Sequence, residues 1–81
     1  MTDAVIVFVT CEDDEQAEHI AEAVVDQKLA ACVNAVSGVS SIYRWEGKVQ
    51  QSKETLLICK SRSGLTPELM EFVRKIGRAH V

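Results

Sequence analysis

Three cysteines and two histidines are the side chains of this sequence best suited to hold a soft metal ion. Cys11 follows an apolar run and is the thiol expected to be accessible, whereas Cys32 and Cys59 lie in apolar segments and are expected in the core. If the end of the first strand and the end of the second helix share an edge, Cys11 and His80 come together. Thiolate and imidazole would suit copper or another divalent cation, so both residues are candidate ligands, although two ligands alone are few for a metal site.

A second group of possible ligands, Glu15, His19 and Glu22, has the i, i+4, i+7 spacing of one helix face. A solvated face with ordinary charge pairs is the favoured interpretation. The four glycines, at positions 38, 47, 64 and 77, are scattered and form no phosphate-binding loop. Nucleophilic catalysis finds little support in this chain, which we expect not to be an enzyme.

The segment around Trp45 combines aromatic and charged side chains at the tip of an expected hairpin. Its candidate interface residues are Tyr43, Arg44, Trp45, Glu46 and Lys48. An exposed aromatic and arginine cluster is typical of a partner interface, and the alternative is that Trp45 folds back onto its own sheet. We favour self-association.

The first half of the chain predicts a strand, a helix and a long second strand. Residues 5–9 are continuously apolar and are expected to be buried on both faces. Asp13 is a good N-cap for a helix from residue 15 to about residue 30. A second extended stretch covers residues 32–45, with a bend or bulge at Gly38.

The second half predicts a return strand and a second helix. Glu46 and Gly47 fit a tight hairpin turn, and the return strand runs from residue 48 to about residue 61. Thr66 is the expected N-cap of the next helix, with Pro67 at its first position. Gly77 suits the C′ position that ends it.

This β-α-β-β-α order predicts a single α+β domain over residues 1–81, a ferredoxin-like sandwich with two helices on one face of an antiparallel sheet. The four residues after Gly77 are too few for the usual closing strand. We therefore expect the first strand to have an open edge. Either another chain covers that edge, or the sequence is a form shortened after the second helix.

Charge and composition exclude several classes of protein. Nine Lys and Arg against twelve Asp and Glu give a net charge of −3, which argues against nucleic-acid binding. No apolar run is long enough to span a membrane, and the N-terminus has no basic segment typical of a signal peptide. With an odd number of cysteines and no C-x-x-C pair, we expect a reducing, cytoplasmic setting.

The sequence strongly resembles the CutA divalent-cation tolerance family over roughly residues 4–76. The residues that carry this resemblance are Leu29-Ala30-Ala31-Cys32-Val33-Asn34, Gly38, Ser41 and Tyr43-Arg44-Trp45-Glu46-Gly47-Lys48. The resemblance implies a fold like that of the PII signalling proteins and a stable homotrimer in which hairpins of neighbouring subunits pair edge to edge. It also implies a link to tolerance of divalent cations, notably copper.

The copper site of the family is not transferred residue by residue. In some bacterial members a cysteine of the first strand and two histidines after the second helix are assigned as ligands. The cysteine position corresponds here to Val9, and the family's His-Pro-Tyr-x-x-Pro-Glu continuation is replaced by residues 77–81. Cys11 lies two positions further along the same strand.

The leading hypothesis is a non-catalytic, trimeric binding protein involved in the response to divalent metals. The alternative is a PII-like regulatory module that senses a small anionic metabolite. A third class, an acylphosphatase-like hydrolase, shares the order of elements but needs an anion-binding loop after the first strand. The acidic run Cys11-Glu12-Asp13-Asp14 repels phosphate and disfavours that class.

Overall fold

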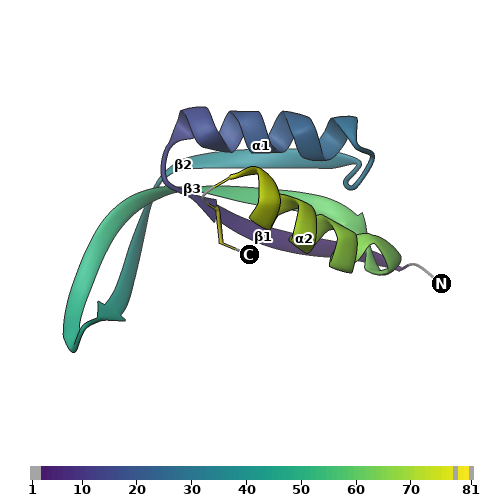
Figure 1. Cartoon of the computed structure of the whole chain (residues 1–81). Helices are drawn as coiled ribbons and strands as arrows, with labels where there is room; N and C mark the ends of the chain where they lie inside the picture. Colours follow the sequence, from purple (N-terminus) through teal and green to yellow (C-terminus); the bar gives the residue numbers. More distant parts are fainter. Residues whose placement is uncertain (1–2, 78, 81) are drawn as a thin grey trace.

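The protein folds into one antiparallel sheet with two α-helices on the same face (Figure 1). The computed structural model describes residues 3–77, 79 and 80. Its elements are β1 (Ala4–Cys11), α1 (Asp14–Asp26), β2 (Cys32–Trp45), β3 (Lys48–Arg62), a 3-10 turn (Ser63–Leu65), α2 (Thr66–Ile76) and β4 (Ala79–His80). The strand order is β2-β3-β1-β4. The predicted ferredoxin-like arrangement is confirmed.

The core lies between the helices and one face of the sheet. Val9 of β1 and Leu57 of β3 are fully buried there against Ile20 of α1. The prediction that residues 5–9 are buried on both faces is wrong, because Ile6 and Phe8 are 56% and 57% exposed. Alternate side chains of a strand point to opposite faces, and both helices cover the same one. The other side of the sheet, here called the open face, has no helix over it.

The long β2–β3 hairpin bends away from the body and projects from it (Figure 1). Glu46 and Gly47 have φ values of 50° and 77° and form the expected two-residue turn, with Trp45 opposite Lys48. The register shifts between Val36 and Val39, where Gly38 has a φ of 70°. This confirms the expected bulge, and bulges bend strands and increase their twist.

Helix α1 begins where the sequence predicts and ends sooner. Asp13 caps it by accepting a hydrogen bond from the Gln16 amide at 2.8 Å. The helix stops at Asp26 instead of continuing to about residue 30, because Lys28 takes a left-handed φ of 61°. The Leu29 amide then bonds back to the Val24 carbonyl, which closes a Schellman motif with lysine in the usual glycine position.

Both ends of α2 differ from the prediction. The 3-10 turn leads directly into the helix, so Leu65 is the N-cap and Thr66 is already helical, with its hydroxyl donating to the Arg62 carbonyl at 3.4 Å. Gly77 is extended, with a φ of −165°, and so does not adopt the left-handed C′ conformation. Glycine leaves room for the Ile20 side chain, because a Cβ there would lie 2.8 Å from Ile20 Cδ1.

A closing strand is present, contrary to the expectation that it is missing, but it has two residues. Thr10 pairs with His80 and Cys11 with Ala79. Within the described residues, β4 thus leaves residues 5–9 of β1 without a strand along their outer edge. The inference of an open edge therefore holds for most of β1.

Candidate functional site

Cys11 is a buried core residue, and the prediction of an accessible thiol is wrong. It lies at the end of β1 on the helix-facing side and has no exposed surface. Burial raises the pKa of its thiol to about 11, and the nearby carboxylates of Asp13 and Glu54 add to the shift. Because the thiolate is the metal-binding form, this environment opposes metal binding at neutral pH.

His80 lies close to Cys11 along the β1–β4 ladder but opposite a different residue. The register pairs His80 with Thr10, and Thr10 and Cys11 point to opposite faces of β1. The side chain of His80 lies outside the described part of the structure, so its pairing with Cys11 stays a prediction. No cluster of three or more His, Cys, Asp or Glu suited to a metal ion occurs among the described residues.

The other two cysteines differ in their exposure to solvent. Cys59 is buried, as predicted. This burial, and to a smaller extent the nearby Cys11, raises the pKa of its thiol to about 11. Cys32 is exposed, contrary to its predicted place in the core. It begins β2 opposite Lys60, on the open face, where no helix covers it. Both cysteines have apolar neighbours in the sequence, so the sequence does not show that Cys59 is buried and Cys32 exposed.

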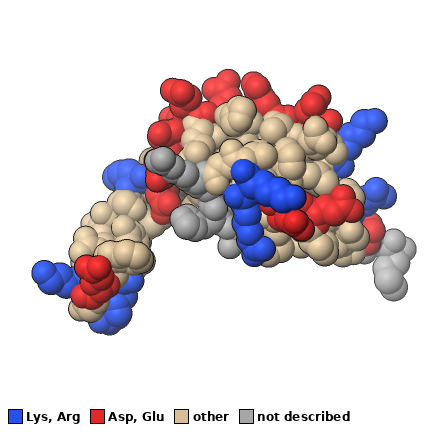
Figure 2. Space-filling view, in the orientation of Figure 1, with Lys and Arg blue, Asp and Glu red and all other residues tan. Residues whose placement is uncertain are grey.

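The helix face that carries Glu15, His19 and Glu22 is a solvated acidic surface. All three residues are exposed. Figure 2 shows acidic side chains in a row along the top of the body, over α1. This arrangement agrees with the favoured interpretation of a charged helix face.

The predicted hairpin tip forms one side of a cavity of about 570 Å³. Its lining residues are Thr10, Ser41, Tyr43, Trp45, Ser52 and Glu54. Tyr43 and Trp45 are 44% and 62% exposed, so Trp45 is not buried against its own sheet. Ser41, Tyr43 and Trp45 alternate along β2 and line this cavity together, so they share one face of the hairpin. Ser52 lies opposite Ser41 on the neighbouring strand.

The aromatic hairpin face continues into the open face of the sheet. Across that face the register aligns Phe8 with Ile58, and Leu56 with Val36. Phe8 and Val36 are exposed and the other two are half-buried. Exposed apolar side chains thus occupy the middle of the sheet and the hairpin tip, with Thr10, Ser41, Ser52 and Glu54 between them on the same face. Exposed apolar groups of this kind mark interaction sites.

Asp14 connects the base of this hairpin to α1. Its Oδ1 accepts hydrogen bonds from the Ser37 hydroxyl at 2.7 Å and from the Thr55 hydroxyl at 2.5 Å. These two bonds, that from Thr55 first, hold the pKa of the Asp14 carboxyl below its usual value. Ser37 lies in the β2 bulge and Thr55 on the facing strand, so one carboxylate ties three segments where the hairpin bends. No local sequence pattern predicts this contact, because Asp14 and Thr55 are 41 positions apart in the chain.

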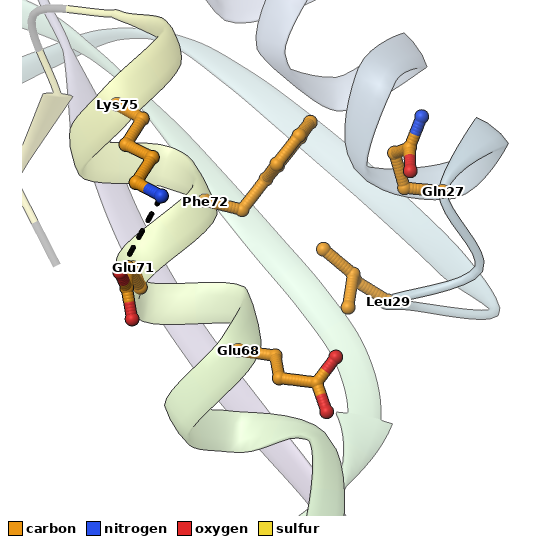
Figure 3. Close-up of a pocket in the computed structure, with 6 residues that line it drawn as sticks. All are labelled: Gln27, Leu29, Glu68, Glu71, Phe72 and Lys75. Atoms are coloured by element: carbon orange, nitrogen blue, oxygen red, sulfur yellow. Dashed lines mark ion pairs between the residues drawn. The ribbon is translucent and has the colours of Figure 1, made fainter.

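A separate groove of about 360 Å³ lies between the end of α1 and α2 (Figure 3). Leu29 and Phe72 point toward one another across it, with Gln27 and Glu68 at its border. Lys75 is paired with Glu71 at 3.5 Å on the outer side of α2. The groove offers an apolar floor but few convergent polar groups.

Comparison with known proteins decides the family. Residues 5–81 match the family described as CutA1 divalent ion tolerance protein. The chain belongs to the CutA family. Its leucine-alanine-rich segment before β2 and its aromatic hairpin are thus those of a CutA protein, as their resemblance implied.

The relatives of this CutA chain include proteins of animals, plants and bacteria. It is 48% identical over 69 residues to Protein CutA of Mus musculus, which covers 85% of this chain and 39% of the relative. It is 44% identical to the divalent-cation tolerance protein CutA of Thermus thermophilus, covering 88% and 69%. The chain thus spans less than half the length of the mouse relative.

Solved CutA structures share the fold. The crystal structure of CutA1 from Oryza sativa matches with a TM-score of 0.89 and 39% identity, covering 98% of this chain and 75% of that one. The Thermus thermophilus Cut A1 structure matches with a TM-score of 0.85, over 88% and 69%. The architecture and the projecting hairpin therefore belong to the family fold.

The names of relatives point to more than one compartment. An Arabidopsis thaliana relative is named chloroplastic, and an Archaeoglobus fulgidus structure is described as a periplasmic protein. The cytoplasmic location expected from the cysteines therefore stays a prediction for this chain. In the described part of the chain, no helix has the length and apolar character needed to cross a membrane.

Proposed function

We propose that this CutA chain works as a homotrimer, a non-catalytic scaffold in the response to divalent metal ions. The open face and the hairpin would be its subunit contacts. The observation that carries the proposal is the exposure of large apolar side chains on one face, Ile6 and Phe8 on the sheet and Trp45 on the hairpin. The trimer is the state that the resemblance to the family implies.

Other copies of the same chain are the partner that best fits this surface. Exposed apolar side chains lie both on the sheet, where Phe8 is 57% exposed, and on the hairpin, where Trp45 is 62% exposed. A hairpin that projects from the body exposes both of its faces, and Ile42 on the second face is 70% exposed. Aromatic anchors next to charged residues are typical of interface centres and rims.

The predicted contact residues are Tyr43, Arg44, Trp45, Glu46 and Lys48. Trp45 and Lys48 are opposite one another at the tip, and Arg44 faces Val49. In an assembly, the ring of Trp45 would be covered while the charged residues border it. Burial of a large aromatic side chain contributes roughly 1.5–3 kcal/mol, which makes Trp45 the principal anchor.

The divalent metal ion enters the proposal through the family, whose members are named divalent-cation tolerance proteins. The specific hypothesis for the metal site is that Cys11 and His80 bind copper. The structure around Cys11 does not favour this hypothesis, because Cys11 is fully buried and the pKa of its thiol is about 11. Any ion held there must first displace the thiol proton, so binding should strengthen as the pH rises.

The PII-like alternative, a module that senses a small anionic metabolite, has one supporting observation. Lys28, Lys60 and Arg62 border a common cavity at the end of the sheet away from the hairpin tip. Thermal unfolding with nucleotides and with metal ions separates the two functions. A shift with nucleotide and none with metal would favour the regulator.

The fluorescence of Trp45, the single tryptophan, tests the proposed assembly. Emission should move to shorter wavelength as protein concentration rises, because association removes the ring from water. Phe8→Glu places a charge in the open face without touching the hairpin, and it should keep the emission of Trp45 at long wavelength. Glu18→Gln on the exposed face of α1 is the control and should behave as the unaltered chain. Emission that does not change with concentration, at the wavelength of water-exposed tryptophan, would contradict assembly.

Calorimetric titration with Cu²⁺ and Zn²⁺ tests the metal proposal. Cys11→Ser and His80→Ala should each weaken binding, and Cys32→Ser should not. If Cys11→Ser binds as the unaltered chain does, Cys11 is not a ligand. If the unaltered chain binds neither ion, the metal proposal fails while the assembly proposal is unaffected.

A further inference from the structure

A cavity of about 360 Å³ lies at the end of the sheet opposite the hairpin tip. It is formed where α1 ends, β2 begins and β3 ends. Lys28, Lys60 and Arg62 line it, and no acidic residue does. Figure 2 shows basic side chains at this end of the body, beyond the acidic row over α1.

These three basic residues have no partner in the described structure. The ion pair found among the described residues joins Lys75 to Glu71, away from this cavity. Lys28, Lys60 and Arg62 make no hydrogen bond or ion pair through their side chains. The like charges around the cavity repel one another. A bound anion would attract all three cations and so offset this repulsion.

The backbone at Lys28 adds an independent observation. Lys28 occupies the left-handed position of the Schellman motif with a φ of 61°, where glycine is favoured. The chain therefore keeps a lysine at a position where glycine would stabilise the fold. Backbone strain of this kind is concentrated at functional positions. Lys28 also lines the cavity, so the strained position and the cavity coincide.

The negative end of the α1 dipole opposes an anion nearby, but three of the carbonyls at this end already accept hydrogen bonds. The carbonyls of Ala23, Val24 and Val25 accept bonds from the three amides that follow the helix, at 2.9 to 3.0 Å. The Ser61 hydroxyl likewise donates to the Leu29 carbonyl at 2.6 Å. Lys28, Lys60 and Arg62 are the charged residues of the cavity lining.

We propose that this cavity binds a small organic polyanion with two or more carboxylate or phosphate groups. Three cations favour a multiply charged ligand over a single carboxylate, and the planar fork of Arg62 suits the oxygens of both groups. Val25, Ala30 and Leu65 supply an apolar wall for a short carbon skeleton. The site deepens the anion-sensing alternative and does not depend on self-association.

Calorimetric titration of the full chain at low ionic strength provides the test, with citrate, pyrophosphate and acetate as probes. Citrate, pyrophosphate or both should bind, acetate should bind at least about tenfold more weakly, and added salt should weaken the binding. A stronger response to citrate assigns a carboxylate ligand, and a stronger response to pyrophosphate assigns a phosphate ligand. Absence of binding by both polyanions would overturn the proposal.

Matched variants locate the site. Lys28→Gly and Arg62→Gln should each weaken binding of the polyanion about tenfold, as expected for loss of a charge-assisted hydrogen bond. Lys28→Gly should also unfold at a higher temperature than the unaltered chain, so a loss of binding cannot be ascribed to misfolding. Arg74→Gln, which removes the same charge from the exposed side of α2, should bind normally. Equal weakening by Arg74→Gln and Arg62→Gln would show only diffuse attraction and would overturn the site.

Discussion

The Asp14 carboxylate is the polar contact on which the geometry of the hairpin base depends most directly. It is the first residue of α1, and it accepts bonds from the β2 bulge and from β3. Because its pKa is lowered, the folded state favours the ionised form. The stabilisation is complete above the ordinary carboxyl pKa of about 3.9 and is lost as the pH falls through the folded-state value.

Asp14→Asn should therefore lower the urea midpoint of unfolding at pH 7, because the hydroxyls then donate to a neutral amide. The difference from the unaltered chain should begin to shrink as the pH falls below about 4 and disappear below the lowered folded-state pKa, where the folded protein also protonates Asp14. Circular dichroism during urea titration measures both effects. Glu15→Gln removes the adjacent exposed charge and should lack this pH-dependent difference; a gap of constant size at all pH values would count against the role of Asp14.

The three thiols should react in an order set by their surroundings. Cys32 is exposed, whereas Cys11 and Cys59 are buried with pKa values of about 11. At pH 8, alkylation followed by peptide mass analysis should label Cys32 first, and the other two only after urea is added. Labelling of Cys11 as fast as Cys32 in the folded protein would show that the end of β1 is open to solvent.

Sequence alone could identify these residues but not their surroundings. Residue type and spacing singled out Cys11 and placed Asp13 correctly as a cap, because capping is a contact between near neighbours. The exposures of Cys11 and Cys32 were predicted the wrong way round. Which side of a strand is covered depends on where the helices pack, and no local pattern at either cysteine reports it.

At the scale of elements, turn chemistry was predictable and helix ends were less so. Glu46-Gly47 and Gly38 were correctly placed, since the left-handed backbone at Gly47 and Gly38 favours glycine. The end of α1 was missed because Lys28, a residue with good helix propensity, takes the position where glycine is expected. Gly77 was correctly placed at a helix end but for the wrong reason, because its role is to make room for Ile20.

Gly77→Ala should lower the stability of the fold by about 1–3 kcal/mol, as expected for overpacking of a filled core. Ile20 is fully buried, so its Cδ1, 2.8 Å from the new Cβ, cannot move into solvent. The cost should be smaller in an Ile20→Val background, which removes that atom. Gly64→Ala is the matched control, since nothing lies within 4 Å of its Cβ position. Equal effects of both alanines on the urea midpoint would contradict this packing argument.

At the scale of the whole molecule, the fold divides the surface into parts of different character. Helix α1 covers one side with acidic residues, while the other side leaves β1, β3 and the hairpin with apolar side chains in water. The order of elements predicted this fold and the open edge of β1. The continuity of the open face with Tyr43 and Trp45 required the bulge geometry, which sets how the hairpin leaves the sheet.

The molar mass in solution, measured by light scattering after size-exclusion chromatography, tests the central claim that the open face and hairpin bind copies of the same chain. The unaltered chain should have three times its 8.9 kDa mass. Phe8→Glu and Trp45→Ser should shift it toward the single-chain mass, while Glu18→Gln should not. A mass of one chain for the unaltered protein, at every concentration loaded, would contradict the account.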